Sequence, residues 1–182
     1  MLVTHDRHEA AALADETALL VAGRIRQHGP TSEVLDRPVD PDCARLLGYT
    51  NQLPPAVTGR DELLVARPER CRPVHGPPGL DELGVGGVVR RVVPLGAGTR
   101  VDVDTLAGAL ACYTDAASAG GPAPDGARPG DPITVVVAEA DTRQCSGTVK
   151  PRVFLPSSRQ QFGAFPGRSS PRTRRSCDHS IG

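Results

Sequence analysis

One histidine near the start of the chain stands where a side chain could take part in catalysis. His5 follows the short apolar stretch Leu2-Val3-Thr4, which predicts a strand, and precedes residues 7–14, which predict a helix. A histidine at such a strand-to-helix turn can donate a hydrogen bond to an oxyanion, and its charge changes near neutral pH. Taken alone, His5 is a turn histidine in water, so its chemistry depends on what the fold brings to it.

The residues after His5 predict a small α/β segment that ends near Gly48. Ala10, Leu13 and Ala14 share one helical face, and residues 18–22 are a continuous apolar run of the kind found in strands that are covered on both faces. The predicted elements are a helix over residues 7–14, a strand over 18–22, a hairpin over 23–30 that leads to a turn, a short capped helix over 31–35, and a helix that Asp40-Pro41 begins and Gly48 ends.

Residues 50–144 predict five short strands with glycine and proline between them, which is typical of a small barrel. We expect Gly86-Gly87 to break the second strand through a bulge or bend, Gly96-Ala97-Gly98 to form a hairpin turn, and residues 116–128 to form a long loop. The predicted strands are Leu63–Arg67, Val85–Pro94, Thr99–Val103, Ala107–Tyr113 and Ile133–Ala138.

Composition separates the last part of the 182-residue chain from the rest. Residues 1–145 contain 14 Arg and 20 Asp or Glu, whereas residues 146–182 contain seven Arg or Lys and one Asp. The second stretch shows no periodicity and is rich in Ser, Pro, Gly and Arg, so we expect a disordered basic tail. With only five aromatic residues in the chain, the core must consist mainly of Val, Leu and Ala.

No apolar run approaches the roughly 20 residues that cross a bilayer, and the first residues do not resemble a signal peptide. We therefore expect a cytosolic protein that reaches a membrane only through a partner. The five cysteines are widely spaced and form no C-x-x-C pair or metal-ligand pattern, so we expect reduced, chemically inert thiols and no metal site.

Five motifs between Leu2 and Asn51 follow one another as in the ATP-binding subunits of ABC transporters. They read VTHD, EAAALAD, GRIRQHG, PTSEVLDRP and ARLLGYTN. The chain thus resembles the end of the ATPase domain of that family. The resemblance implies that His5 is the histidine that reaches the γ-phosphate of ATP and helps to position the attacking water, while an upstream carboxylate acts as base.

A second resemblance covers the predicted barrel. ARPER at residues 66–70 and RPGDPITVVVAEADTRQ at residues 128–144 are similar to phrases of the transport-associated OB-type (TOBE) domain, which follows the ATPase in importers of molybdate, sulfate, polyamines and sugars. The expected fold class is therefore an α/β remnant of a nucleotide-binding domain followed by a small, mostly β OB-type barrel. The expected boundaries are 1–49 for the ATPase end, 50–145 for the TOBE-like domain and 146–182 for the tail.

The intact family binds ATP and Mg²⁺, pairs with a second ATP-binding subunit and docks on a membrane permease at the inner face of the membrane. This sequence has no G-x-x-x-x-G-K-[ST] loop, because its only lysine is Lys150, and it lacks the SGGQ signature and an apolar strand ending in Asp-Glu ahead of His5. Glu139 and Asp141 imitate that strand end but come after His5. We therefore expect no cofactor for this chain alone and no ATP hydrolysis by it, and whether it is itself an enzyme stays open.

The main hypothesis is the C-terminal part of an importer's ATP-binding subunit, and the sequence does not indicate the solute. One alternative is a stand-alone regulatory module whose barrel binds a small oxyanion or a partner protein. A second is a non-functional truncated product. Nucleic-acid binding is disfavoured, because Tyr113 is the only aromatic residue in the predicted barrel and residues 1–145 are acidic.

Overall fold

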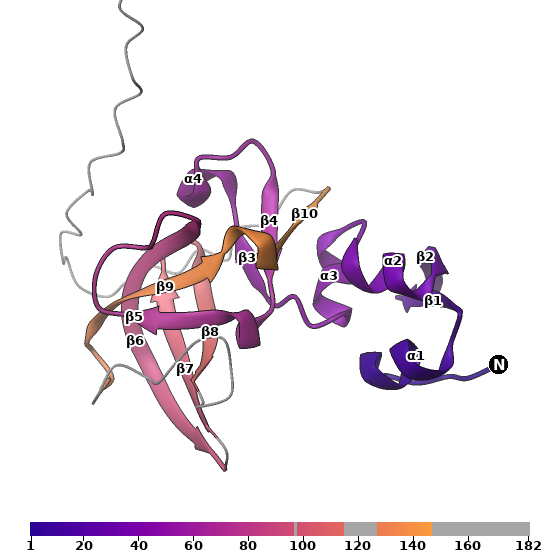
Figure 1. Ribbon diagram of the computed structural model, residues 1–182, viewed down its shortest axis with the longest axis horizontal. Coiled ribbons are helices and arrows are strands. Elements are labelled where there is room, and N and C mark those ends of the chain that lie inside the picture. Colours follow the sequence, from indigo (N-terminus) through magenta and orange to yellow (C-terminus); the bar gives the residue numbers. More distant parts are fainter. Residues whose placement is uncertain (97, 115–126, 147–182) are drawn as a thin grey trace, which may run out of the picture.

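The computed structural model describes residues 1–96, 98–114 and 127–146, which form short N-terminal elements and two β-sheets (Figure 1). The five-stranded sheet lies on the left of Figure 1, the N-terminal elements lie on the right, and the three-stranded sheet lies between them. The elements are α1 (Arg7–Leu13), β1 (Glu16–Val21), β2 (Arg24–Pro30), α2 (Thr31–Asp36), α3 (Pro41–Leu46), β3 (Asn51–Leu53), α4 (Pro55–Thr58), β4 (Leu63–Ala66), η1 (Pro68–Arg70), β5 (Cys71–Val74), β6 (Glu82–Leu95), β7 (Gly98–Thr105), β8 (Gly108–Thr114), β9 (Pro132–Ala138), η2 (Glu139–Asp141) and β10 (Thr142–Cys145).

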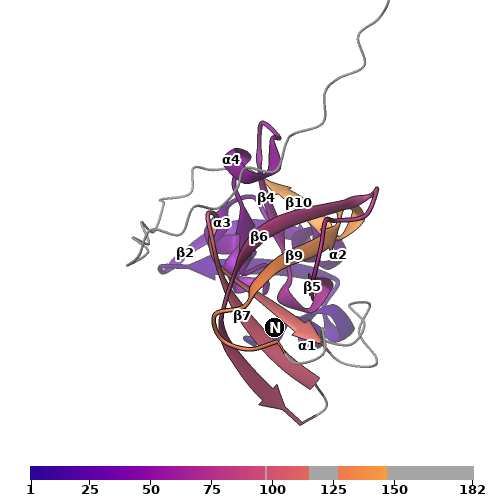
Figure 2. The ribbon, with the colours of Figure 1, turned by 90° about the vertical axis from the view of Figure 1, so that its left-hand side faces the viewer.

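The five-stranded sheet is antiparallel, with the strand order β5-β9-β6-β7-β8. It curls into a half-barrel, and Figure 2 shows its long strands β6 and β7 in front of the N-terminal elements. Val101 and Val103 on β7 point into the core, whereas Asp102 between them belongs to the opposite face. The curl is consistent with the predicted OB-type barrel, and we call β3–β10 with the elements between them the barrel.

Asn51 connects β3 to the free edge of the five-stranded sheet. Its side-chain amide donates to the carbonyl oxygen of Ala111 on β8 at 2.7 Å, and its carbonyl oxygen accepts from the Ala111 backbone N–H at 2.9 Å. The amide also lies 3.1 Å from the Sγ of Cys71. Asn51 therefore pairs with a buried strand edge as a neighbouring strand would, which satisfies backbone groups that water cannot reach.

The second sheet has the order β10-β4-β3, and its central strand is buried on both faces. Leu64 and Ala66 of β4 belong to the barrel core, whereas Leu63 and Val65 belong to a second core shared with the N-terminal elements. The alternation follows from the two-residue period of a strand. The second core consists of Leu19, Val34, Cys43, Ala44, Leu47, Tyr49, Leu63, Val65 and Cys145.

Most predicted N-terminal elements form within one or two residues of the expected positions. Asp40 caps α3 as predicted: its carboxylate accepts from the backbone N–H groups of Asp42 and Cys43, and Gly48 ends this segment with a φ of +87°. The predicted cap of the helix at residues 31–35 is wrong. Residue Pro30 occupies the N-cap of α2, and no side chain bonds there.

Two N-terminal predictions are wrong because they require neighbours that the described residues do not supply. Leu2-Val3-Thr4 forms no strand, since no described strand pairs with it. Strand β1 is covered on one face only: Leu19 is buried, but Leu20 is 63% exposed. β1 pairs with β2 alone in a two-stranded ribbon. An apolar run shows that a strand can be buried on both faces, but burial itself depends on the elements around it.

The five predicted barrel strands form as β4, β6, β7, β8 and β9, but the break in β6 lies elsewhere. The ladder between β6 and β9 continues through Gly86 and Gly87, and the register shifts between Val89 and Arg91 instead. A Cβ on Gly87 would lie 2.5 Å from the backbone oxygen of Asp104, so glycine here permits a close approach of two strands.

Three short strands were not predicted: β3, β5 and β10 have only three or four residues each, and their sequences NQL, CRPV and TRQC contain few apolar residues. The hairpin predicted around Gly96-Ala97-Gly98 has the expected ends, because Leu95 pairs with Gly98, while Ala97 lies outside the described residues. Most of the predicted 116–128 loop and all but Ser146 of the predicted tail also lie outside them.

Replacing Asn51 by leucine is expected to destabilise the protein by about 2 to 6 kcal/mol. The change leaves both backbone groups of Ala111 buried without a partner, and each unsatisfied group costs about 1 to 3 kcal/mol. Urea unfolding followed by circular dichroism measures the loss. The half-buried neighbour Gln52, replaced by leucine, is the matched control and should change the free energy of unfolding by less than about 1 kcal/mol. Equal effects of both changes would contradict the role of Asn51.

Candidate functional site

His5 lies on an exposed bend immediately before α1, and the residues around it fix that bend. The Thr4 hydroxyl accepts from the backbone N–H of Asp6 at 3.0 Å and donates to Glu9 at 2.6 Å. The Asp6 carboxylate caps α1 by accepting from the backbone N–H of His8 at 2.7 Å. The sequence therefore builds a helix start at this point, and the imidazole of His5 projects from it without a hydrogen bond to a described residue.

The Asp6 carboxylate adds charge to this helix start. The hydrogen bond from the His8 backbone N–H lowers the pKa of Asp6 below its ordinary value, because it stabilises the ionised form. An anionic cap also suits the positive end of the helix. Asp6 is thus ionised at neutral pH and serves the backbone of α1, so it is not free to act as a general base beside His5.

The two carboxylates that imitate a catalytic strand end are engaged elsewhere. Glu139 and Asp141 lie on η2, directly after β9. Glu139 pairs with Arg60 at 2.5 Å, and Asp141 lies 3.8 Å from Arg70. Within the described part of the chain neither carboxylate bonds to the His5 turn, and their partners belong to the barrel.

Three arginines connect the N-terminal elements to the barrel. Arg7 of α1 pairs with Glu69 of η1, and its Nη1 lies 3.4 Å from the carbonyl oxygen of Leu47. Arg67 stacks on the ring of Tyr49, with its Cζ 4.3 Å from the ring centre. The two contacts of Arg7 join residues 40 and 62 positions apart, and the third bridge, Arg143 of β10 to Asp36 of α2, spans 107 residues.

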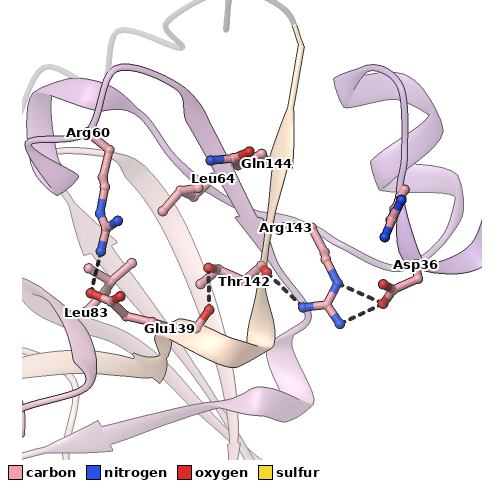
Figure 3. A pocket seen from close by; sticks show the side chains of 9 residues that line it. Asp36, Arg60, Leu64, Leu83, Glu139, Thr142, Arg143 and Gln144 are labelled. Carbon is pink, nitrogen blue, oxygen red and sulfur yellow. Dashed lines mark hydrogen bonds and ion pairs between the residues drawn. The ribbon is translucent and has the colours of Figure 1, made fainter.

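A hollow of about 590 Å³ lies beside the third bridge, between the end of α2 and the barrel (Figure 3). The Nε and Nη2 atoms of Arg143 lie 2.7 Å and 2.6 Å from one Asp36 oxygen, and Arg143 also donates to the carbonyl oxygen of Ala140. The residues that line the hollow are Asp36, Arg37, Arg60, Leu64, Leu83, Glu139, Thr142, Arg143 and Gln144.

The charges around the hollow favour an anionic guest over a cationic one. Three arginines and two carboxylates line it, and both carboxylates are paired with arginine. Arg37 is exposed and forms no ion pair with a described residue. The Gln144 side chain, which projects from β10 in Figure 3, can donate as well as accept. The charged side chains that line the hollow thus carry a net positive charge.

A second arginine cluster lies on the outer face of the barrel, over the bulge in β6. The Asp102 side chain is only 2% exposed, and three arginines surround it: Arg91 Nη2 at 2.9 Å, Arg100 Nε at 2.7 Å and Arg90 Nη2 at 3.6 Å. Burial alone would raise the pKa of Asp102, but hydrogen bonds from Arg100 and Arg91 outweigh it and hold the pKa below its ordinary value. The bulge allows two consecutive arginines to reach one carboxylate.

The described cysteines are buried and are poor nucleophiles. Burial raises the pKa of Cys43 and of Cys145 to about 11 each, and that of Cys71 to about 12. Burial also raises the pKa of Cys112. Among the described residues, no group of three or more His, Cys, Asp or Glu side chains is placed to hold a metal ion. Cys177 lies outside these residues.

The sequence did not indicate which arginine pairs with which carboxylate in the bridges between the N-terminal elements and the barrel. Arg7, Glu69, Asp36 and Arg143 are ordinary charged residues of a chain with 21 basic and 21 acidic side chains. Only the fold shows which of them meet. The one local signal that could have been used is the pair of adjacent arginines in the middle of β6, where a regular strand would place them on opposite faces.

Residues 64–144 match the TOBE domain family. The matched stretch begins in β4 and ends in β10, so it contains the whole five-stranded sheet together with two strands of the smaller sheet. Residues before Leu64 lie outside this match, and the alignment that covers 84% of the chain, described next, includes some of them.

Three relatives represent the similarity of the chain to complete proteins. It is 30% identical over 154 residues to the sulfate/thiosulfate import ATP-binding protein CysA of Mycolicibacterium paratuberculosis, an alignment that covers 84% of this chain and 40% of the relative. It is 45% identical over 60 residues to the Fe(3+) ions import ATP-binding protein FbpC of Streptomyces coelicolor, covering 33% of this chain and 17% of the relative.

The third relative is the spermidine/putrescine import ATP-binding protein PotA of Acidothermus cellulolyticus. The chain is 31% identical to it over 130 residues, which covers 57% of this chain and 34% of the relative. In all three alignments this chain therefore spans less than half of the relative's own length.

We expect Cys43, Cys71, Cys112 and Cys145 to resist alkylation in the folded protein. With a pKa near 11, only about one thiol in a thousand is ionised at pH 8, and the thiolate is the reactive form. Iodoacetamide treatment at pH 8 followed by peptide mass spectrometry measures this, with the same treatment in urea as the control. Rapid labelling of any of the four without denaturant would show that its surroundings open easily.

Proposed function

Because this chain corresponds in sequence to the C-terminal region, with its TOBE domain, of the ATP-binding subunits of importer-type ABC transporters, we propose that it serves as that region of such a subunit. The intact subunit would drive import of a small solute by hydrolysing ATP. The observation that carries the proposal is the match of residues 64–144 to the TOBE domain, extended by an alignment over 84% of the chain to an import ATP-binding protein.

Within this proposal, residues 1–49 are the end of the ATPase domain and residues 50–145 are the TOBE domain of OB type. This division is supported by the second core, in which residues of β1, α2 and α3 pack on β4 and β10. The packing gives the N-terminal elements a covered face on the barrel. The proposal also accounts for the exposed apolar side chains of Leu13, Leu20 and Ile25, since the remainder of an ATPase domain would cover them.

His5 is the residue that we propose meets ATP. An exposed imidazole at a fixed turn can donate to a phosphate oxygen and position a water molecule. The described residues do not fit a complete ATP and Mg²⁺ site, because they include no carboxylate cluster, and the only lysine of the chain, Lys150, is followed by proline. His5 would therefore act only together with phosphate-binding residues that this sequence lacks.

The partners follow from the same proposal. A membrane permease would hold the subunit at the inner face of the cell membrane, and a second ATP-binding subunit would complete the ATP site. No helix in the described ranges is long and apolar enough to cross a bilayer. The relatives are named for Fe³⁺, sulfate or thiosulfate, and spermidine or putrescine, so the match does not select one solute.

A second candidate function is that of a module that binds a small oxyanion. The specific observation is the hollow between α2 and β10, with Arg37, Arg60 and Arg143 in its lining. A ligand there would touch the N-terminal elements and the barrel at once. This function needs no ATP hydrolysis, and it could exist beside the first or in its place.

The test of the main proposal uses the protein in its own cells. Antibodies against the exposed residues 75–81 would capture it, and mass spectrometry would analyse the captured polypeptide and its companions. We expect a polypeptide that also contains a G-x-x-x-x-G-K-[ST] sequence or is bound to one, together with a permease of several membrane-spanning helices. Recovery of the 182-residue chain with neither of these would contradict the proposal.

The purified 182-residue chain is expected to show no ATP turnover and no measurable affinity for ATP with Mg²⁺. Without a phosphate-binding loop, His5 can supply at most one contact to the nucleotide. A coupled phosphate-release assay and equilibrium dialysis measure the two properties, with the variant His5→Ala as the control for contaminating ATPases. Turnover that persists through repurification and disappears in His5→Ala would overturn the expectation.

If the hollow binds an oxyanion, sulfate should shift the amide resonances of residues 142–144, and Arg37→Gln should weaken the binding at least tenfold. A hydrogen bond to a charged group contributes about 1.5 to 3 kcal/mol, which corresponds to such a factor. Arg45→Gln is the control, because Arg45 is 61% exposed on α3 and does not line the hollow. Absence of sulfate-dependent shifts at residues 142–144 would exclude this ligand class, and shifts that Arg37→Gln leaves unchanged would exclude Arg37 as a ligand-binding residue.

A further inference from the structure

We infer that Arg7 is a positioning residue that couples the barrel to the turn carrying His5. The importance of that turn rests on the proposed function of His5, whereas the coupling itself rests on contacts of Arg7. Arg7 is the first residue of α1, next to the cap Asp6 and two residues after His5. Any force on its side chain therefore acts at the start of the helix, where the His5 turn is built.

The side chain of Arg7 spans the seam between the two parts of the structure. Its Nη2 pairs with Glu69 on η1 of the barrel, and its Nη1 lies 3.4 Å from the carbonyl oxygen of Leu47. The Arg7 side chain is 27% exposed and that of Glu69 is 38% exposed, so the pair is partly shielded from water. A guanidinium is suited to this position because its planar fork can serve two acceptors that lie in different directions.

Gly48 shows that the backbone makes room for this arginine. A Cβ on Gly48 would lie 2.0 Å from Arg7 Nη1, and the glycine has a φ of +87°, which L side chains rarely adopt. Glycine at this position thus does two things: it ends the segment after α3 and leaves the space in which the guanidinium lies. The contact therefore depends on both partners: Arg7 supplies the guanidinium, and residues 47–48 supply the carbonyl oxygen and the space beside it.

α1 has little else to hold it in place. None of its seven residues is buried, and Leu13 at its end is 73% exposed. A helix of this length is not stable by itself and requires tertiary contacts. α1 also packs beside α2, but among the described residues its side-chain bond to the barrel is that of Arg7 to Glu69. A displacement of η1 would consequently move the start of α1, and the His5 turn with it.

The coupling can be measured in the 182-residue chain without ATP or a partner. Backbone ¹⁵N relaxation reports the order parameters of Asp6–Leu13, and imidazole resonances report on His5. We expect order parameters near 0.85, typical of rigid backbone, to fall below about 0.6 in Glu69→Gln and in Gly48→Ala. The His5 resonances should shift in the same variants. Glu69→Gln removes the charge of the ion pair with Arg7, and Gly48→Ala fills the space in which the Arg7 guanidinium lies.

The control is Glu62→Gln, which neutralises an exposed carboxylate close in sequence to Glu69 and in no recorded ion pair with a described residue. It should leave the order parameters of α1 and the His5 resonances unchanged. The order parameters of the β7 amides should be unchanged in every variant. The double variant Arg7→Glu with Glu69→Arg restores an ion pair of reversed polarity. It should show higher order parameters in α1 than Glu69→Gln, whereas two substitutions that only disturbed local packing would lower them further.

Unchanged order parameters in Glu69→Gln would overturn the coupling, and so would an equal loss of order in β7, because the effect would then be general destabilisation. Either result leaves the proposed transporter role untouched, since no ATP-dependent property enters the measurement. Conversely, absence of a permease in the cellular experiment would remove the proposed function without altering the expected behaviour of Arg7.

Discussion

Strand β4 has no exposed face, and this constraint holds the two parts of the structure together. Leu64 and Ala66 complete the barrel core, while Leu63 and Val65 complete the core shared with β1, α2 and α3. A polar residue at any of these four positions would therefore lose apolar burial, and a slip of one residue would exchange the two sets of side chains. β3 and β10 flank β4, and through Asn51 of β3 the same small sheet also satisfies the edge of β8. The four residues of β4 thus contribute to both hydrophobic cores, that of the barrel and that shared with the N-terminal elements.

Local signals were sufficient to predict the elements whose ends are set by local chemistry. Asp40 beside Pro41 begins α3 and Gly48 ends the segment, because cap hydrogen bonds and a positive φ involve only nearby residues. The strand β4 could be predicted from its continuous apolar sequence LLVA, which is also a local signal. The predictions for Leu2–Thr4 and for both faces of β1 failed because they concern neighbours: the run of residues is suited to a covered strand, but coverage comes from parts of the chain far away in sequence. Asn51 could not be assigned either, since its partner is the backbone of a residue 60 positions later.

The candidate site divides in the same way. The sequence located His5 and its turn, because the threonine, the aspartate and the helix after them form a local unit with bonds between residues two to five apart. It could not locate the bridges from Arg7 to Glu69 or from Asp36 to Arg143, nor the hollow between α2 and β10. Charge alone does not determine which arginine meets which carboxylate in a chain that has many of both. The residues that connect the site to the rest of the protein are therefore found only from the fold.

The seam between the N-terminal elements and the barrel has an apolar centre and arginines at its margin. Val34, Leu47 and Val65 exclude water from the centre, whereas the margin is formed by the contacts of Arg7, Arg67 and Arg143. Apolar packing resists separation but has little directional preference, while a guanidinium bound to a carboxylate or a carbonyl oxygen fixes orientation. The Asp36 carboxylate is 50% exposed, so water can replace its arginine at little cost, and pairs of this kind contribute weakly to stability. The apolar centre of the seam therefore keeps the two parts together, while the arginines at its margin set their orientation. A change in that orientation would act on Arg7, whose backbone lies two residues from His5.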